Sequence, residues 1–221
     1  MPEFGPGLSY QDAGEGRPLV LLHGFMGDGS FWRPEQFPGF RVIRPDFRGH
    51  GRSAHPDDKR FYPPDVLADD GLALVEHLGL DDYDLAGYSL GARIVVRMLV
   101  KGARPRRAIV GGQGLREVRG LGGGAGAAFR KQAGGPSPLI HVLDSLVATP
   151  AEALTAVPTP TLVVIGAEDE RAASGPDLAA ALPHGSYAEI PGNHGTVAGS
   201  PELIAAMLAY LRPSTTSRAA S

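Results

Sequence analysis

The chain has 221 residues, of which 43% are hydrophobic and 20% charged, and its formal net charge is −3 at pH 7. This composition is that of a globular protein and excludes a disordered or fibrous chain, and the length fits one large α/β domain. Lysine and arginine are scattered except for a short run at residues 104–107, so we expect no nucleic-acid partner.

The sequence contains no cysteine, which excludes disulfides, thiolate metal sites and cysteine nucleophiles. No apolar run approaches the roughly 18 residues that span a membrane. Residues 1–7 also lack the basic and apolar regions of a signal peptide. We therefore expect no membrane span and a cytoplasmic protein, although a mature form from which a leader had been removed would look the same.

Short apolar runs, bounded by Gly, Pro or Asp, alternate with longer segments of helical period along the chain. In chain order, the expected strands are residues 19–22, 41–43, 83–86, 107–110 and 161–165, with a strand-like run at 187–190. The expected helices are residues 65–78, 90–100, 139–146, 176–182 and 201–211. This alternation predicts an α/β fold in a single domain over residues 1–212, with a mostly parallel central sheet and helices on both faces.

Residues 87–91 read Gly-Tyr-Ser-Leu-Gly, a G-x-S-x-G motif between an expected strand and an expected helix. In a chain with 31 glycines the pentapeptide alone arises easily by chance, but its position is the one that the chemistry requires. A sharp turn there holds the serine in a strained conformation, and the helix N-terminus directs free amides at a developing oxyanion. The motif predicts Ser89 as a nucleophile.

Two regions interrupt the alternation of strands and helices. Residues 111–138 are crowded with glycine, so we expect a reduced, mobile lid insertion with few apolar contacts from residues 120–135 to the rest of the domain. The pocket would then be open to water, with Ser89 reachable from solvent, which favours short to medium acyl esters. Residues 213–221, rich in Ser, Thr and Ala, predict a disordered tail.

Four motifs, spread from about residue 8 to residue 211, together resemble those of the α/β-hydrolase fold family. They are His-Gly-Phe at residues 23–25, Asp-Phe-Arg-Gly-His-Gly-Arg-Ser at 46–53, the Gly-Tyr-Ser-Leu-Gly turn at 87–91 and Gly-Asn-His at 192–194. The resemblance implies the α/β-hydrolase fold with a minimal glycine-rich lid. It also implies an oxyanion hole formed by the backbone N–H groups of Phe25 and Leu90.

A serine hydroxyl needs a base, and the order of residues in the family directs the search downstream of Ser89. Of the three histidines there, His194 lies in a Gly-Asn-His-Gly loop before the last helix and matches the family's position. His184 is expected in a surface turn and His141 in a helix. The resemblance therefore selects His194 as the catalytic base.

The acid of the triad is expected after the strand at residues 161–165, where it can accept a hydrogen bond from the imidazole. The family's G-x-x-D turn matches residues 166–169 and selects Asp169. Glu168 and Glu170 qualify by chemistry but are expected to be solvated. Asp144 is a remote alternative, because some relatives carry the acid after the previous strand.

Candidate substrate-binding residues surround these motifs: Phe25, Met26 and Tyr88 are expected to contact the substrate. Other residues near the motifs are expected to be structural. Phe31 and Trp32 are assigned to the core, and His23, Arg48 and His50 to hydrogen bonds that hold loops in place.

The identity of the nucleophile separates reactions within the family. Epoxide hydrolases and haloalkane dehalogenases with this fold use Asp at the strand-to-helix turn that carries the nucleophile, called the elbow, and dienelactone hydrolases use Cys. Ser89 therefore favours hydrolysis of carboxylic esters or lactones through an acyl-enzyme.

Residues 22–27 and 87–93 are also similar to the menaquinone-pathway synthase, a lyase that eliminates pyruvate with the same triad. A binding-only domain is a further alternative. No metal or cofactor is expected, because the histidines form no HExxH or other ligand spacing, and the oligomeric state is not predicted.

Overall fold

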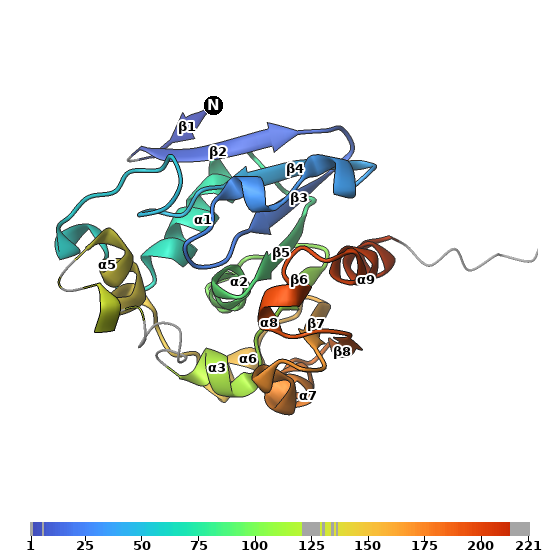
Figure 1. Ribbon diagram of the computed structural model, residues 1–221. Coiled ribbons are helices and arrows are strands. Elements are labelled where there is room, and N and C mark those ends of the chain that lie inside the picture. Colours follow the sequence, from blue (N-terminus) through green and yellow to red (C-terminus); the bar gives the residue numbers. More distant parts are fainter. Residues whose placement is uncertain are drawn as a thin grey trace, which may run out of the picture.

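The computed structural model describes residues 2–5, 7–120, 129, 131–133, 135 and 137–212 (Figure 1). The predicted tail at residues 213–221 and the glycine-rich stretch at residues 121–128 lie outside the described residues. In the described ranges, no helix has both the length and the apolar character needed to cross a membrane.

Eight strands form one sheet in the order β1-β2-β4-β3-β5-β6-β7-β8. Neighbouring strands in the part β4-β3-β5-β6-β7-β8 of this order are parallel. Strand β2 is antiparallel to both of its neighbours, β1 and β4. The strands are β1 (Glu3–Phe4), β2 (Leu8–Ala13), β3 (Arg17–Leu22), β4 (Phe40–Pro45), β5 (Asp84–Tyr88), β6 (Ala108–Gly111), β7 (Thr161–Gly166) and β8 (Gly185–Ile190). The predicted mostly parallel sheet is confirmed. The strands β1 and β2 were not predicted, because Leu8–Ala13 mixes polar with apolar residues and forms no apolar run.

The helices connect these strands as the alternation predicted. The α-helices are α1 (Val66–His77), α2 (Leu90–Val100), α3 (Leu115–Arg119), α5 (Pro138–Ser145), α6 (Ala151–Leu154), α7 (Gly175–Ala181), α8 (His194–Val197) and α9 (Pro201–Leu211). Short 3₁₀ helices are η1 (Gly29–Phe31), η2 (Pro34–Gln36), η3 (Lys59–Phe61) and η4 (Glu170–Ser174). The five predicted helices correspond to α1, α2, α5, α7 and α9.

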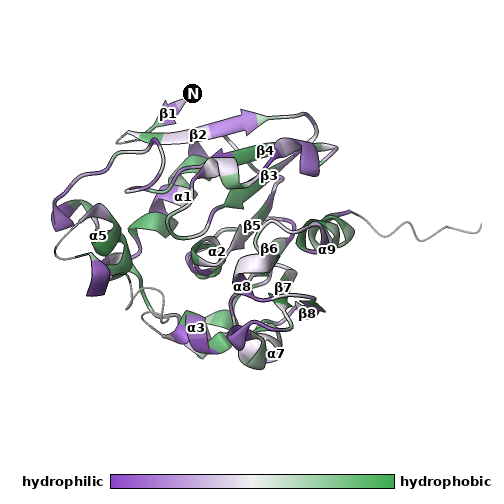
Figure 2. Ribbon diagram, in the orientation of Figure 1, coloured by the Kyte–Doolittle hydropathy of each residue, from purple (hydrophilic) through white to green (hydrophobic). Residues whose placement is uncertain are grey.

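Two apolar layers cover the two faces of the sheet, because successive side chains of a strand point to opposite sides. In β3, Val20 and Leu22 face the layer to which α1, α2 and α7 contribute, whereas Leu19 and Leu21 face the layer with α9 and Trp32. Figure 2 shows hydrophobic residues along β3, β4 and α9, which contribute to these layers. Full burial of one such leucine contributes about 1.5–3 kcal/mol, so the two layers hold the carboxyl ends of the parallel strands at one edge.

The stretch 111–138, predicted as a mobile loop, contains a packed helix. Residues 115–119 form α3, and its Val118 is fully buried. The buried guanidinium of Arg93 in α2 donates hydrogen bonds to the backbone oxygens of Glu117 (2.6 Å) and Gly120 (2.5 Å). The loop prediction is wrong for this part, because the run Leu-Arg-Glu-Val-Arg contains no glycine and gains stability from burial and from Arg93.

Candidate active site

Ser89 lies at the sharp turn between β5 and α2, with backbone angles φ 55° and ψ −113°. This positive φ is strained for a residue with a side chain, and the strain costs on the order of 1–3 kcal/mol. The turn is held by hydrogen bonds from Ser89 N to the Gly111 oxygen (2.8 Å) and from Arg93 N to the Ser89 oxygen (3.1 Å). Ser89 itself is half-buried, so part of it remains accessible to solvent, as the sequence predicted.

The two glycines of the motif make this turn sterically feasible. A Cβ atom on Gly87 would lie 2.4 Å from the backbone carbon of Gly91, and a Cβ atom on Gly91 would lie 2.2 Å from the backbone oxygen of Leu22 in β3. Neither backbone atom can move without displacing the strand or the helix to which it belongs. Only glycine fits at either position.

The structure brings Ser89, His194 and Asp169 together in one hydrogen-bonded chain. His194 Nε2 lies 2.9 Å from Ser89 Oγ, and His194 Nδ1 lies 2.7 Å from Asp169 Oδ2. The three residues come from different elements: Ser89 follows β5, Asp169 follows β7, and His194 begins α8 after β8. The carboxyl ends of parallel strands meet at one edge of the sheet, so residues 105 positions apart become neighbours.

The environment of Asp169 keeps its carboxyl group ionised. Its side chain is 1% exposed, and this burial by itself raises the pKa. Hydrogen bonds from the backbone and side chain of Arg171 and from His194 outweigh the burial and lower the pKa of Asp169 below its usual range. The carboxylate therefore accepts from His194 Nδ1–H, which leaves Nε2 free to accept the Ser89 hydroxyl proton.

The other candidate acids and bases do not take part in this chain. Glu168 and Glu170 are exposed, as expected, and His184 lies in an exposed turn after α7. His141 and Asp144 both lie on α5. None of these five side chains is hydrogen-bonded to His194 or Ser89 in the part of the chain that the structure describes.

Tyr88 holds His194 in place through a hydrogen bond and ring stacking. Its hydroxyl donates a 2.6 Å hydrogen bond to the backbone oxygen of His194, and the two rings stack with centroids 5.2 Å apart. Burial raises the pKa of Tyr88, so the phenol remains a donor at ordinary pH. Tyr88 is 2% exposed. The structure thus gives it a supporting position under His194, where the sequence had suggested contact with substrate.

The loop at residues 23–25 runs beside Ser89. A Cβ atom on Gly24 would lie 3.7 Å from Ser89 Cβ. His23 is fully buried and structural, as expected: its Nε2 accepts from Phe47 N (3.0 Å), and its Nδ1 donates to the Gly24 oxygen (2.8 Å). Burial lowers the pKa of His23 to about 4, so the ring is neutral and this pattern of one donor and one acceptor is fixed.

The turn at residues 46–53 connects the loops around the site. Asp46 accepts hydrogen bonds from Gly29 N (2.6 Å) and Arg52 N (2.8 Å), while Ser53 Oγ donates to the Asp46 backbone oxygen (2.6 Å). Arg48 forms a bidentate ion pair with Asp70, at 3.0 and 2.8 Å. The expectation that Arg48 is structural is confirmed, and Asp46 and Ser53 hold the same turn in place.

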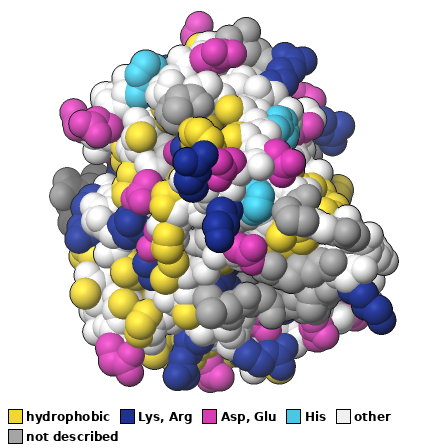
Figure 3. All heavy atoms as spheres, turned by 90° about the vertical axis from the view of Figure 1, so that its left-hand side faces the viewer, with side chains coloured by type: hydrophobic (Ala, Val, Ile, Leu, Met, Phe, Trp, Pro, Cys, Tyr) yellow, Lys and Arg dark blue, Asp and Glu magenta, His cyan; other side chains and the backbone are white. Residues whose placement is uncertain are grey.

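A cavity of about 610 Å³ lies beside the loop that carries Phe25 and Met26. Met26 is 64% exposed and lines it, while the half-buried Phe25 packs edge-on against Phe129 and His50, which also line it. The remaining lining residues are Gly27, Gly49, Gly51, His55, Ala133, Ser137, Pro138 and Leu139. Figure 3 shows hydrophobic side chains and histidines together on the face that carries α5. The wall is mainly apolar, with His50, His55 and Ser137 as its polar side chains.

The matching family model, described as alpha/beta hydrolase fold, covers residues 17–110. The protein has the α/β-hydrolase fold. A non-heme haloperoxidase from Rhodococcus erythropolis is 38% identical to it over 104 residues, which are 44% of this chain and 36% of that protein. The aligned segments cover only 35–36% of the length of the first three curated relatives.

Solved structures resemble the chain over more of its length. A bromoperoxidase from Bacillus anthracis has a TM-score of 0.74 and 25% identity, covering 93% of this chain and 95% of that one. An enzyme described as degrading N-acyl homoserine lactones has a TM-score of 0.71 and 26% identity, covering 93% of this chain and 96% of that one. The fold therefore extends well beyond the segment matched by the family model.

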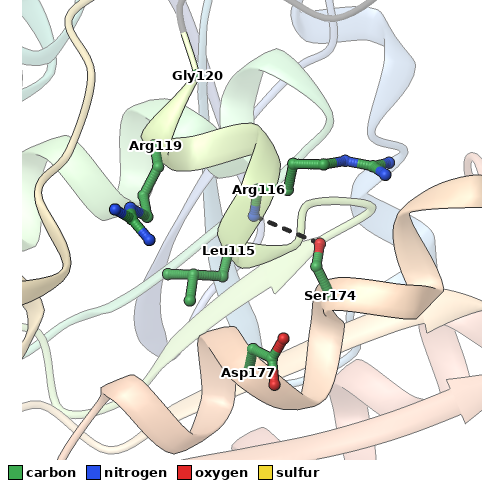
Figure 4. Close-up of a pocket in the computed structure, with 6 residues that line it drawn as sticks. All are labelled: Leu115, Arg116, Arg119, Gly120, Ser174 and Asp177. Carbon is green, nitrogen blue, oxygen red and sulfur yellow. Dashed lines mark hydrogen bonds between the residues drawn. The ribbon is translucent and has the colours of Figure 1, made fainter.

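A second hollow of about 450 Å³ lies between α3 and the segment of η4 and α7. It is lined by Leu115, Arg116, Arg119, Gly120, Ser174 and Asp177 (Figure 4). The backbone N of Arg116 donates to Ser174 Oγ (3.4 Å) across its rim. Neither α3 nor η4 carries a recognisable motif, so their place near the site was not predicted from the sequence. The only signal for Arg171 was its position two residues after Asp169.

Proposed function

We propose that the protein is a serine hydrolase that cleaves carboxylic esters of small to medium substrates. The observation that carries the proposal is the hydrogen-bonded chain from Asp169 through His194 to Ser89, with Ser89 at a strained turn before the N-terminus of α2. Ser89 is the nucleophile, His194 the general base and Asp169 the acid that orients the imidazole.

The reaction follows from these roles. Ser89 Oγ attacks the carbonyl carbon of the ester, and its proton passes to His194 Nε2. The tetrahedral oxyanion is stabilised by the backbone N–H groups of Leu90 and Phe25; Leu90 begins α2, so its N–H lacks an acceptor within the helix. The imidazolium then gives the proton to the departing alkoxide oxygen, which leaves as the alcohol. Water, deprotonated by His194, cleaves the resulting acyl-enzyme and regenerates the serine.

The substrate range is inferred from the cavity beside Phe25 and Met26. Its largely apolar wall suits acyl or alcohol groups of short to medium length, and the partial exposure of Ser89 permits entry of substrate from solvent. One structural neighbour is described as degrading N-acyl homoserine lactones, and a lactone is a cyclic ester with the same reacting bond, so lactones belong in the substrate panel.

Hydrolysis of p-nitrophenyl esters of increasing chain length tests this proposal. We expect turnover by the wild type and a loss on the order of 10⁴-fold or more in Ser89→Ala, because no other group supplies the attacking oxygen. The exposed serine variant Ser30→Ala is the matched control and keeps wild-type activity. Mass spectrometry would detect the acyl group on Ser89. Binding of esters or lactones without turnover by the folded wild type would contradict the proposal, and so would elimination of pyruvate from a suitable substrate without hydrolysis of any ester.

A further inference from the structure

Arg171 holds the oxygen of Asp169 that His194 does not use. Its backbone N–H and its guanidinium Nη1 both donate to Asp169 Oδ1, at 3.1 and 2.9 Å. Asp169 Oδ2 accepts from His194 Nδ1. The Arg171 side chain is 13% exposed, so its charge is only partly screened by water. A permanent cation thus shares the carboxylate on which His194 depends.

The helix η4 keeps Arg171 in this position. Asp169 caps its N-terminus, and at its C-terminus Ser174 Oγ donates to Glu117 Oε2 of α3 (3.0 Å) and accepts from Arg116 N (Figure 4). A Cβ atom on Gly114 would lie 2.1 Å from Ser174 Oγ, so the approach of α3 to η4 is as close as a glycine allows. The packed α3 therefore braces the segment that carries Arg171.

We propose that Arg171 is a positioning residue that fixes the carboxylate of Asp169 toward His194 and, through its charge, sets the pH range in which His194 acts as a base. The proposal rests on the function proposed above. The two hydrogen bonds from Arg171 to Oδ1 hold the carboxylate of Asp169 in one orientation, in which Oδ2 faces His194. The guanidinium also offsets part of the negative charge that would stabilise a protonated His194, so it favours the neutral ring that the reaction requires.

Other charged and titratable groups lie around this pair. Tyr88 of β5 stacks on His194 and stays protonated. Glu170 on η4 is 3.9 Å from Arg171 Nη1 but largely exposed, so water screens it. Arg116 and Glu117 of α3 pair with each other at 2.8 Å, and their charges offset one another. Arg171 lies closer to Asp169 than to Glu170, and the Asp169 side chain is the more buried of the two carboxylates. Asp169 is therefore the main partner of Arg171.

Three substitutions separate the charge of Arg171 from its hydrogen bond and its packing. Arg171→Gln keeps a side-chain donor without charge, Arg171→Met keeps the aliphatic stem without charge or donor, and Arg171→Lys keeps the charge. Arg119→Gln, on the exposed face of α3, is the matched control for loss of one positive charge. Thermal unfolding of each variant establishes that it is folded.

The first readout is the pH profile of kcat/KM for a p-nitrophenyl ester. In both neutral variants, removal of the cation makes protonation of His194 easier, so the acidic limb of the profile moves up by about half a unit to one unit. In Arg171→Met the plateau also falls by about tenfold, because one hydrogen bond to the carboxylate is lost. Arg171→Lys and Arg119→Gln keep the wild-type limb.

The second readout is an NMR titration of the His194 ring, which needs no substrate. We expect its midpoint to move upward in Arg171→Gln and Arg171→Met and to stay in place in Arg171→Lys. Wild-type midpoints in both neutral variants, or an equal shift in the lysine variant, would overturn the inference. If the wild type hydrolyses no ester, the proposed function fails while the titration still decides the role of Arg171.

Discussion

Ser89 and Asp169 approach His194 from strands that end at the same edge of the sheet, but their two turns are held by different contacts. At the elbow, the backbone atoms around Gly87 and Gly91 leave no space for a Cβ atom, so close backbone–backbone packing determines the path of the chain. At the acid turn, Arg171 holds one carboxylate oxygen of Asp169 through hydrogen bonds and charge. Changes of the elbow glycines should therefore mainly affect folding, and changes at the acid turn should mainly affect rate and pH dependence.

Among substitutions of the residues that hold the two turns, the largest expected effect is at the acid turn. Asp169→Asn keeps the shape of the side chain but presents an amide to His194, which no longer favours the required tautomer. We expect kcat to fall by about 10³- to 10⁴-fold. The free energy of unfolding falls as well, because the largely buried guanidinium of Arg171 loses the charge of its partner.

Glu168→Gln is the control for this substitution, since it makes the same chemical change on the adjacent exposed residue. Steady-state kinetics and urea unfolding of both variants provide the comparison. Equal losses of activity in the two variants would mean that Asp169 has no special role.

Substitution of a glycine at the elbow should lower the free energy of unfolding. In Gly91→Ala, helix propensity favours alanine by about 1 kcal/mol, but the new Cβ atom would lie 2.2 Å from the Leu22 oxygen. The steric effect dominates, and we expect a loss of about 3 kcal/mol in the free energy of unfolding. Gly135→Ala, where no atom lies within 4 Å of the added Cβ atom, is the control. Unchanged stability of Gly91→Ala in urea unfolding would refute the steric account of this turn.

The smallest expected effect concerns Tyr88, which belongs to the elbow strand but supports His194. Tyr88→Phe keeps the stacked ring and removes the hydrogen bond to the His194 backbone oxygen, so kcat/KM should fall by roughly three- to tenfold. Tyr62→Phe is the matched control, because the buried Tyr62 hydroxyl has no hydrogen-bond partner among the described residues. Kinetics on both variants measure the difference, and an equal response would show that the Tyr88 hydroxyl does not position His194.

The sequence by itself determined the parallel sheet, most of its helices and the residues that meet at its edge. Apolar runs indicate buried strands wherever they occur. The steric need for glycine at position 87 is local, because an added Cβ atom would meet Gly91, whereas at position 91 it arises from Leu22 in β3. The roles proposed for His194 and Asp169 came from the family's motifs, and the structure places both side chains beside Ser89. The edge strands β1 and β2 escaped detection, because an antiparallel edge strand tolerates polar residues that break an apolar run.

Only the tertiary structure decided what supports these residues. The glycine-rich stretch predicted a loop, but α3 forms within it, because the gain from burying Val118 and from the Arg93 hydrogen bonds depends on neighbours distant in sequence. Tyr88 supports His194 for the same reason. The position of Arg171 depends on the closeness of α3 to η4. Periodicity and motifs indicate which residues are buried and which can take part in catalysis. The hydrogen-bond partner of a buried polar group depends instead on how the helices and strands pack against each other.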